Sequence, residues 1–107
     1  MEGLWTAEFG SSSGMFGSGV AVFRDGKILG GDNSYFYVGE YTLSGDTFVA
    51  TLRISPFIDG AESVFKTKGQ DLTLELVGTT TDGRATAQGH PKGMPELRFG
   101  ATLIRRG

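Results

Sequence analysis

The sequence contains no cysteine and only one histidine among its 107 residues. Without thiols, neither a disulfide framework nor a thiolate metal site can form, and one histidine does not suffice for a typical zinc site. We therefore expect no metal and no cofactor. Since no Ser/His/Asp arrangement is marked either, the sequence predicts a protein that is not an enzyme.

A surplus of charge of one sign and a long apolar run are also missing. Ten basic residues stand against twelve acidic ones, and only Arg105 and Arg106 are adjacent basic residues. Nucleic-acid binding usually needs a basic patch, so we expect no nucleic-acid partner. No stretch approaches the roughly 20 apolar residues that cross a bilayer, and "MEGLWTAEFG" does not resemble a secretory signal. We expect a soluble cytoplasmic protein with no membrane partner.

Glycine, by contrast, is abundant, with 18 residues spread along the chain. Glycine scattered among β-branched and aromatic residues indicates a β protein with many tight turns. The length fits a single domain, 1–107. Turn signals such as Asp25-Gly26 and Asp82-Gly83 separate strand-like runs. The runs are 3–9, 15–23, 27–31, 34–43, 47–55, 71–78, 84–90 and 96–106.

These eight runs predict an all-β fold, an eight-stranded antiparallel up-and-down β-barrel. Short hairpins produce a meander, and closing it removes two exposed sheet edges. Each run has one apolar side, and an eight-stranded interior is either filled by side chains or holds one small ligand. Both alternatives stay open. The interior side chains that would line a ligand site are Trp5, Phe9, Tyr35, Tyr37, Tyr41, Phe48, Leu52 and Phe99.

The segment "GGDNSYFYVGEY" (30–41) combines a turn with an aromatic strand. Asp32 and Asn33 accept the left-handed backbone conformation, so we interpret Asp32 as a turn former and not as a catalytic acid. Glu40 is interpreted as a solvated outer residue.

The outer side of this strand carries Phe36 and Val38, which need covering. We predict that they, together with Phe23, form the interface of a homodimer. The alternative cover is the irregular segment 57–69, with Phe57, Ile58, Val64 and Phe65.

Two residues at the chain ends suggest how the barrel closes. Gly3-Leu4-Trp5 opens the first strand, and Arg105 ends the last strand in phase with Leu103. Because the first and last strands of a closed meander pair antiparallel, we predict that the Arg105 guanidinium stacks on the Trp5 indole. A Gly-x-Trp opening with a terminal arginine resembles the lipocalin and wider calycin pattern.

A longer resemblance covers nearly the whole chain. "GSGVAVFRDGKILGGDNSYFYVGEY" (17–41), "SVF" (63–65) and "LRFGATLIRR" (97–106) are similar to the type III secretion negative-regulator family, which is GrlR-like. The resemblance implies a lipocalin-like barrel, a homodimer and a non-enzymatic regulatory role through a protein partner in a bacterial cell. The regulator after which that family is named carries an acidic run in the hairpin that follows the aromatic strand. At the matching turn, this chain has a single carboxylate, Asp46. A carrier of a small apolar ligand is the alternative function.

Overall fold

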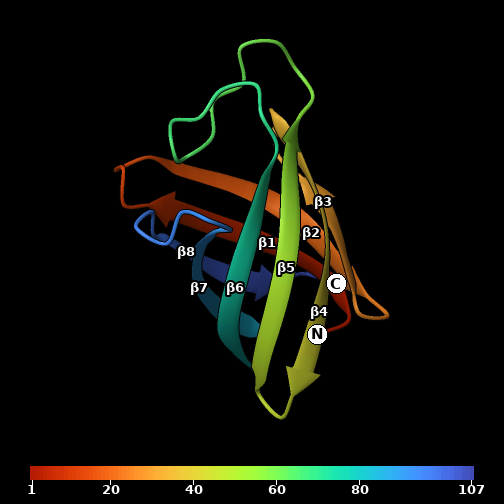
Figure 1. Ribbon diagram of the computed structural model, residues 1–107. Coiled ribbons are helices and arrows are strands. Elements are labelled where there is room, and N and C mark those ends of the chain that lie inside the picture. Colours follow the sequence, from red (N-terminus) through yellow and green to blue (C-terminus); the bar gives the residue numbers. More distant parts are fainter.

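Eight β-strands follow one another along the chain and pair in sequence order (Figure 1). The computed structural model describes residues 1–107. The strands are β1 (Gly3–Ser11), β2 (Phe16–Arg24), β3 (Lys27–Gly31), β4 (Tyr35–Ser44), β5 (Thr47–Pro56), β6 (Leu72–Thr81), β7 (Arg84–Pro91) and β8 (Phe99–Arg105). β1 also pairs antiparallel with β8 and closes the barrel, which confirms the predicted fold. No helix is long and apolar enough to cross a membrane.

Two of the hairpins have the turn chemistry that the sequence indicates. Asp25 and Gly26 have φ values of 50° and 77°, and Asp82 and Gly83 have 53° and 77°. Two consecutive residues with positive φ are required by the type I′ turn, whose twist matches that of the flanking strands. These turns fix the registers of β2 with β3 and of β6 with β7.

The turn between β3 and β4 forms in a different way from the one predicted. Neither Asp32 nor Asn33 has a positive φ, so the expected left-handed conformation is wrong. Instead, Asp32 Oδ1 accepts hydrogen bonds from the backbone N–H groups of Ser34 and Tyr35, each at 2.9 Å. A side-chain oxygen that bonds the backbone two and three residues on closes a turn by itself. Asp32 is therefore a turn former, as expected, but through its carboxylate.

One end of the barrel is closed by an aromatic plug made of Trp5, Phe23 and Tyr41. The ring centroids of Trp5 and Phe23 are 5.9 Å apart, and those of Phe23 and Tyr41 are 5.2 Å apart. The N-terminus covers this plug from outside, because the Trp5 indole N–H donates to the Met1 carbonyl at 3.0 Å. Trp5 is only 1% exposed, so this end is sealed.

The other end is crossed by the segment between β5 and β6, residues 57–71, which we call the cap. In Figure 1 it is the green loop at the top of the barrel. Phe65 of the cap is 5% exposed and lies with its ring centroid 5.9 Å from that of Phe99. The alternative in which this segment covers the outer face of β4 is therefore wrong for Phe65, since its ring enters the barrel.

Candidate functional site

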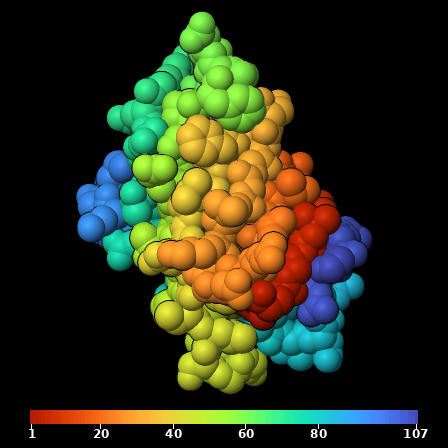
Figure 2. All heavy atoms as spheres, turned by 90° about the vertical axis from the view of Figure 1, so that its right-hand side faces the viewer, coloured from red at the N-terminus to blue at the C-terminus, as the bar shows by residue number.

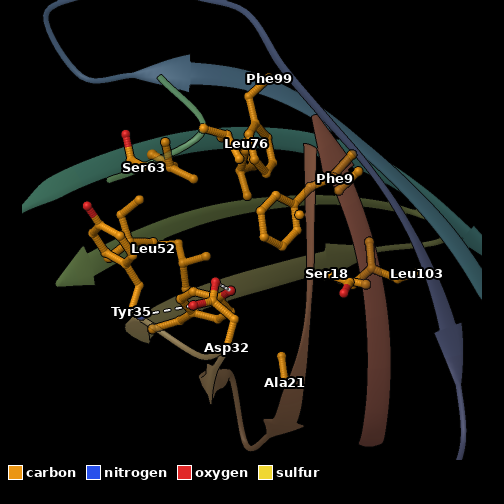
Figure 3. A pocket seen from close by; sticks show the side chains of 18 of the residues that line it. Phe9, Ser18, Ala21, Asp32, Tyr35, Leu52, Ser63, Leu76, Phe99 and Leu103 are labelled. Atoms are coloured by element: carbon orange, nitrogen blue, oxygen red, sulfur yellow. Dashed lines mark hydrogen bonds between the residues drawn. The ribbon is translucent and has the colours of Figure 1, made fainter. Parts of the chain in front are cut away.

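A cavity of about 200 Å³ lies inside the barrel, between the plug and the cap. Of the 29 residues that line it, 22 are hydrophobic, so the cavity is apolar over most of its wall. In Figure 3, Phe9, Leu76 and Phe99 gather on one side of this space, and Tyr35, Leu52 and Asp32 lie on the other. An apolar cavity of about 150 Å³ in another protein is enough to hold benzene, so this one has room for a small molecule.

Six of the eight predicted lining residues do line this cavity. They are Phe9, Tyr35, Tyr37, Phe48, Leu52 and Phe99. Trp5 and Tyr41 also point into the barrel, but they belong to the plug and lie outside the cavity wall. The prediction was wrong for these two, because strand alternation gives the face of a residue and not its height along the barrel axis.

The barrel closes through the predicted antiparallel pairing of the first strand with the last. Trp5 and Arg105 are directly opposed in the pairing of β1 with β8. Opposed residues of antiparallel strands project to the same side, so both belong to the inner face at this end. Arg105 lies at the rim and is exposed, and the aromatic partner of Trp5 is Phe23. Stacking of the guanidinium on the indole stays a prediction.

Glycines on the inner face of β2 make room for the aromatic wall. A Cβ atom at Gly17 would lie 2.7 Å from Phe9 Cε1, and one at Gly19 would lie 2.8 Å from Tyr37 Oη. Real Cβ atoms do not approach other atoms so closely, so only glycine leaves these rings in place. At the height of the cavity, β2 therefore places no side chain between its backbone and the rings of Phe9 and Tyr37.

A partly buried pair of polar side chains, Asp32 and Tyr37, interrupts the apolar wall. Both Asp32 and Tyr37 line the cavity, and the Tyr37 hydroxyl donates a hydrogen bond to Asp32 Oδ2. Burial and then the Asp32 carboxylate raise the pKa of Tyr37 far above its ordinary value of 10.0. The phenol therefore stays protonated and donating at neutral pH. The sequence indicates the turn role of Asp32 but contains no signal for its contact with Tyr37.

Hydrogen bonds hold the cap over the cavity. Ser63 is 4% exposed, and its hydroxyl accepts from the backbone N–H groups of Phe65 and Thr67 at 3.1 and 3.3 Å. From β1 and the turn after it, the hydroxyls of Ser11 and Ser13 both donate to the Val64 carbonyl. Within the "SVF" segment, Ser63 therefore fixes the shape of the cap, Val64 fastens the cap to the end of β1 and the turn after it, and Phe65 enters the interior.

The outer surface carries an apolar row across four strands. Leu4, Val22, Leu29 and Val38 are opposed one after another in the pairings of β1, β2, β3 and β4. They are between 39% and 55% exposed, and Phe36, two residues before Val38 on the same face of β4, is 40% exposed. Figure 2 views this side, where the orange β2–β3 hairpin crosses the face and the green cap stands above it. The cap leaves the row uncovered.

Phe23 is a correction to the predicted outer face. Its side chain is 4% exposed and belongs to the plug, so it cannot contact a second copy of the chain. Both faces of β2 are apolar, with Ala21 and Phe23 on one side and Val20 and Val22 on the other. Alternation alone does not decide which side is inside; barrel closure places Val20 and Val22 outside.

The fold and the site together define a closed β-barrel with a capped apolar cavity and one polar cluster in its wall. No protein-family model matches the chain, and no curated protein matches it. The resemblance to the GrlR-like negative-regulator family therefore stays a prediction.

Proposed function

We propose that the protein is a non-enzymatic binding protein that holds a small, mainly apolar molecule inside the barrel. The observation that carries this proposal is the cavity of about 200 Å³, in which 22 of 29 lining residues are hydrophobic. Ligand sites typically have this form, a concave and mostly apolar wall with a few convergent polar groups. The volume lies below the common range of about 300–1,000 Å³, so a compact ligand is expected.

The cap gives such a ligand a way to be enclosed. It is joined to the barrel by hydrogen bonds of the Ser11, Ser13 and Tyr35 hydroxyls to cap carbonyls and by one backbone hydrogen bond from Phe57 to Ser34. The apolar contacts of three residues, Ala61, Val64 and Phe65, complete its packing. A segment with so few buried contacts opens at lower free energy than the strands around it. Entry and release of a ligand then need only the cap to move, while the barrel stays closed.

Binding is tested by NMR titration of the protein with toluene and naphthalene, two neutral hydrocarbons of compact shape. Shifts should concentrate on the methyl and ring signals of the cavity wall, such as those of Leu52 and Phe99. The variant Ala101→Leu fills the cavity, because Ala101 lines it; this variant should lose binding. The control Thr102→Leu adds the same side chain on the exposed outer side of β8 and should bind like the unchanged protein. A folded protein that shows no saturable shifts with either hydrocarbon would rule out the proposal.

A second candidate function is protein binding through the outer apolar row, with a second copy of the chain as the first partner. The row Leu4, Val22, Leu29 and Val38 favours it, because it is continuous over four strands and lies at one side of the barrel. Two-fold pairing would place the same surface on both subunits and close the assembly. The mass of the protein in solution tests this candidate, and a homodimer agrees with the regulatory role that the family resemblance implies.

A further inference from the structure

The charged side chains of the cavity wall are all of one sign. Asp32 and Glu62 line the cavity, and no lysine, arginine or histidine does. The Glu62 side chain is 37% exposed and forms an ion pair with Lys68, whose Nζ lies 3.9 Å away, so Asp32 is the carboxylate of the wall that a ligand would meet without a paired cation. Because Asp32 is partly buried in a mostly apolar wall, its carboxylate acts more strongly on a ligand than a carboxylate in bulk water does.

The hydrogen bonds at Asp32 decide what kind of polar group a ligand can present. An ionised carboxylate offers about four acceptor positions. Asp32 Oδ1 uses two of them for the N–H groups of Ser34 and Tyr35, and Oδ2 uses one for the Tyr37 hydroxyl. One acceptor position is left. The only hydroxyl proton of Tyr37 already points to Asp32, so Tyr37 Oη can offer a ligand nothing but lone pairs.

The Asp32–Tyr37 cluster can therefore accept hydrogen bonds and cannot donate one. At this cluster a ligand carboxylate would meet the carboxylate of Asp32 and lone pairs of Tyr37, so neither its charge nor its acceptor oxygens would find a match there. A hydroxyl would find an acceptor, and an ammonium group would find an acceptor of opposite charge, which is the stronger hydrogen bond.

We infer that the cavity selects an apolar molecule that carries a hydrogen-bond-donating head group, a primary ammonium above all, and excludes the same molecule with a carboxylate. The apolar body lies among Phe9, Leu52 and Phe99, and the head group binds at Asp32. This inference rests on the proposed function, because it names the ligand class of the same cavity.

Isothermal titration calorimetry at neutral pH with octylamine, octanol and octanoate tests the inference, since the three share one chain and differ in the head group. Octylamine should bind at least about tenfold more tightly than octanoate, the factor that one charge-assisted hydrogen bond provides, with octanol between them. Asp32→Asn keeps an oxygen for the turn and removes the charge, so the amine should lose most of this advantage. The control Asp82→Asn changes a turn aspartate that does not line the cavity and should keep it.

The outcomes separate the two proposals. Equal affinities for the three probes, or tightest binding of octanoate, would overturn the head-group selectivity and leave the apolar binding site intact. A preference for octylamine that survives in a folded Asp32→Asn protein would also overturn it, because the selectivity would then come from elsewhere. If none of the three probes binds and the hydrocarbons also fail, the binding function itself is wrong.

Discussion

Gly19 is the residue where one added methyl group would disturb the polar cluster most directly. A Cβ at this position would lie 2.8 Å from both Tyr37 Oη and the Gly31 carbonyl oxygen. Gly19→Ala should therefore lower the free energy of unfolding by about 1–3 kcal/mol, the usual cost of overpacking. It should also weaken ligand binding, because Tyr37 must move away from Asp32. Chemical denaturation and the calorimetric titration measure the two effects.

Gly100→Ala is the matched control for that substitution. Gly100 is also a strand glycine with an ordinary backbone, and the nearest atom to its Cβ position is the Ala87 carbonyl oxygen at 4.0 Å. Alanine there should be neutral or stabilising by up to about 1 kcal/mol, since glycine is unfavourable inside a strand. Equal effects of the two substitutions would show that the close approach at Gly19 does not limit the site.

The raised pKa values of the three tyrosines allow a prediction of how the stability of the fold depends on pH. Burial, followed by the carboxylate of Asp32 or Glu2, raises the pKa of Tyr35, Tyr37 and Tyr41. The unfolded chain ionises its phenols near the ordinary value of 10.0, while the folded protein keeps them protonated to higher pH. The stabilisation is therefore complete below about pH 10 and is lost as the pH rises above it.

Urea unfolding at pH 8, 9.5 and 11 checks this direction, together with tyrosinate absorbance. The unfolding midpoint should fall between pH 9.5 and 11, and by less in Tyr37→Phe, which has no phenol to ionise there. The absorbance should rise only as the protein unfolds. Ionisation of all three tyrosines near pH 10 in a protein that stays folded and equally stable would contradict the assignment.

At the scale of the elements, Ser63 fixes the conformation of the cap through hydrogen bonds within it. Its buried hydroxyl accepts from two backbone N–H groups and shares a hydrogen bond of 2.7 Å with the Thr67 hydroxyl. Ser63→Ala leaves buried donors without a partner, which costs about 1–3 kcal/mol. We expect faster hydrogen exchange over residues 61–69, with little change in the strands. Ser44→Ala, at an exposed position at the end of β4, is the control and should leave exchange in the cap unchanged. Equal protection of the cap in both variants would contradict this role.

The strands were predictable from the sequence and the cap was not, for a physical reason. The β2–β3 and β6–β7 hairpins carry Asp-Gly pairs, which select a turn type and with it a register. The cap has no period-2 alternation, and Phe65 is placed by packing against Phe99 from another part of the chain. The sequence pattern reflects the local preferences of the backbone for strand and turn. The contact between Phe65 and Phe99 forms only once the barrel has closed, so the local pattern does not indicate it.

The site was predictable only in part for the same reason. The aromatic wall followed from alternation, because Phe9, Tyr37 and Phe99 each lie on the apolar side of a strand. Phe23 was placed on the wrong side, since both faces of β2 are apolar and local pattern does not distinguish them. The second role of Asp32 depends on the approach of Tyr37 Oη to the β3–β4 turn, which no spacing in the sequence indicates.

At the scale of the whole molecule, the barrel has two separate apolar features, the internal cavity and the outer row. The cavity is internal and lies beneath the cap, whereas the outer row runs across β1 to β4. Leu29, the most exposed residue of the outer row, is 55% exposed in a single copy of the chain. A ligand inside and a partner outside can therefore bind together, and the β2–β4 wall between them is the part of the fold through which one could affect the other.

We predict that the protein forms a homodimer through this outer row. A continuous apolar face on a small barrel favours self-association, and a two-fold axis through the row would bring Leu29 and Phe36 of each copy against the other. Light scattering at tens of micromolar should give a mass near twice 11.4 kDa. Phe36→Glu should return the mass to that of one chain while circular dichroism stays that of the folded barrel. Val77→Glu is the matched control, because Val77 on β6 is also 55% exposed but lies outside the row; its mass should stay that of the dimer. A mass near 11.4 kDa for the unchanged protein would contradict the homodimer, and loss of the dimer in both variants would place the interface elsewhere than on the row.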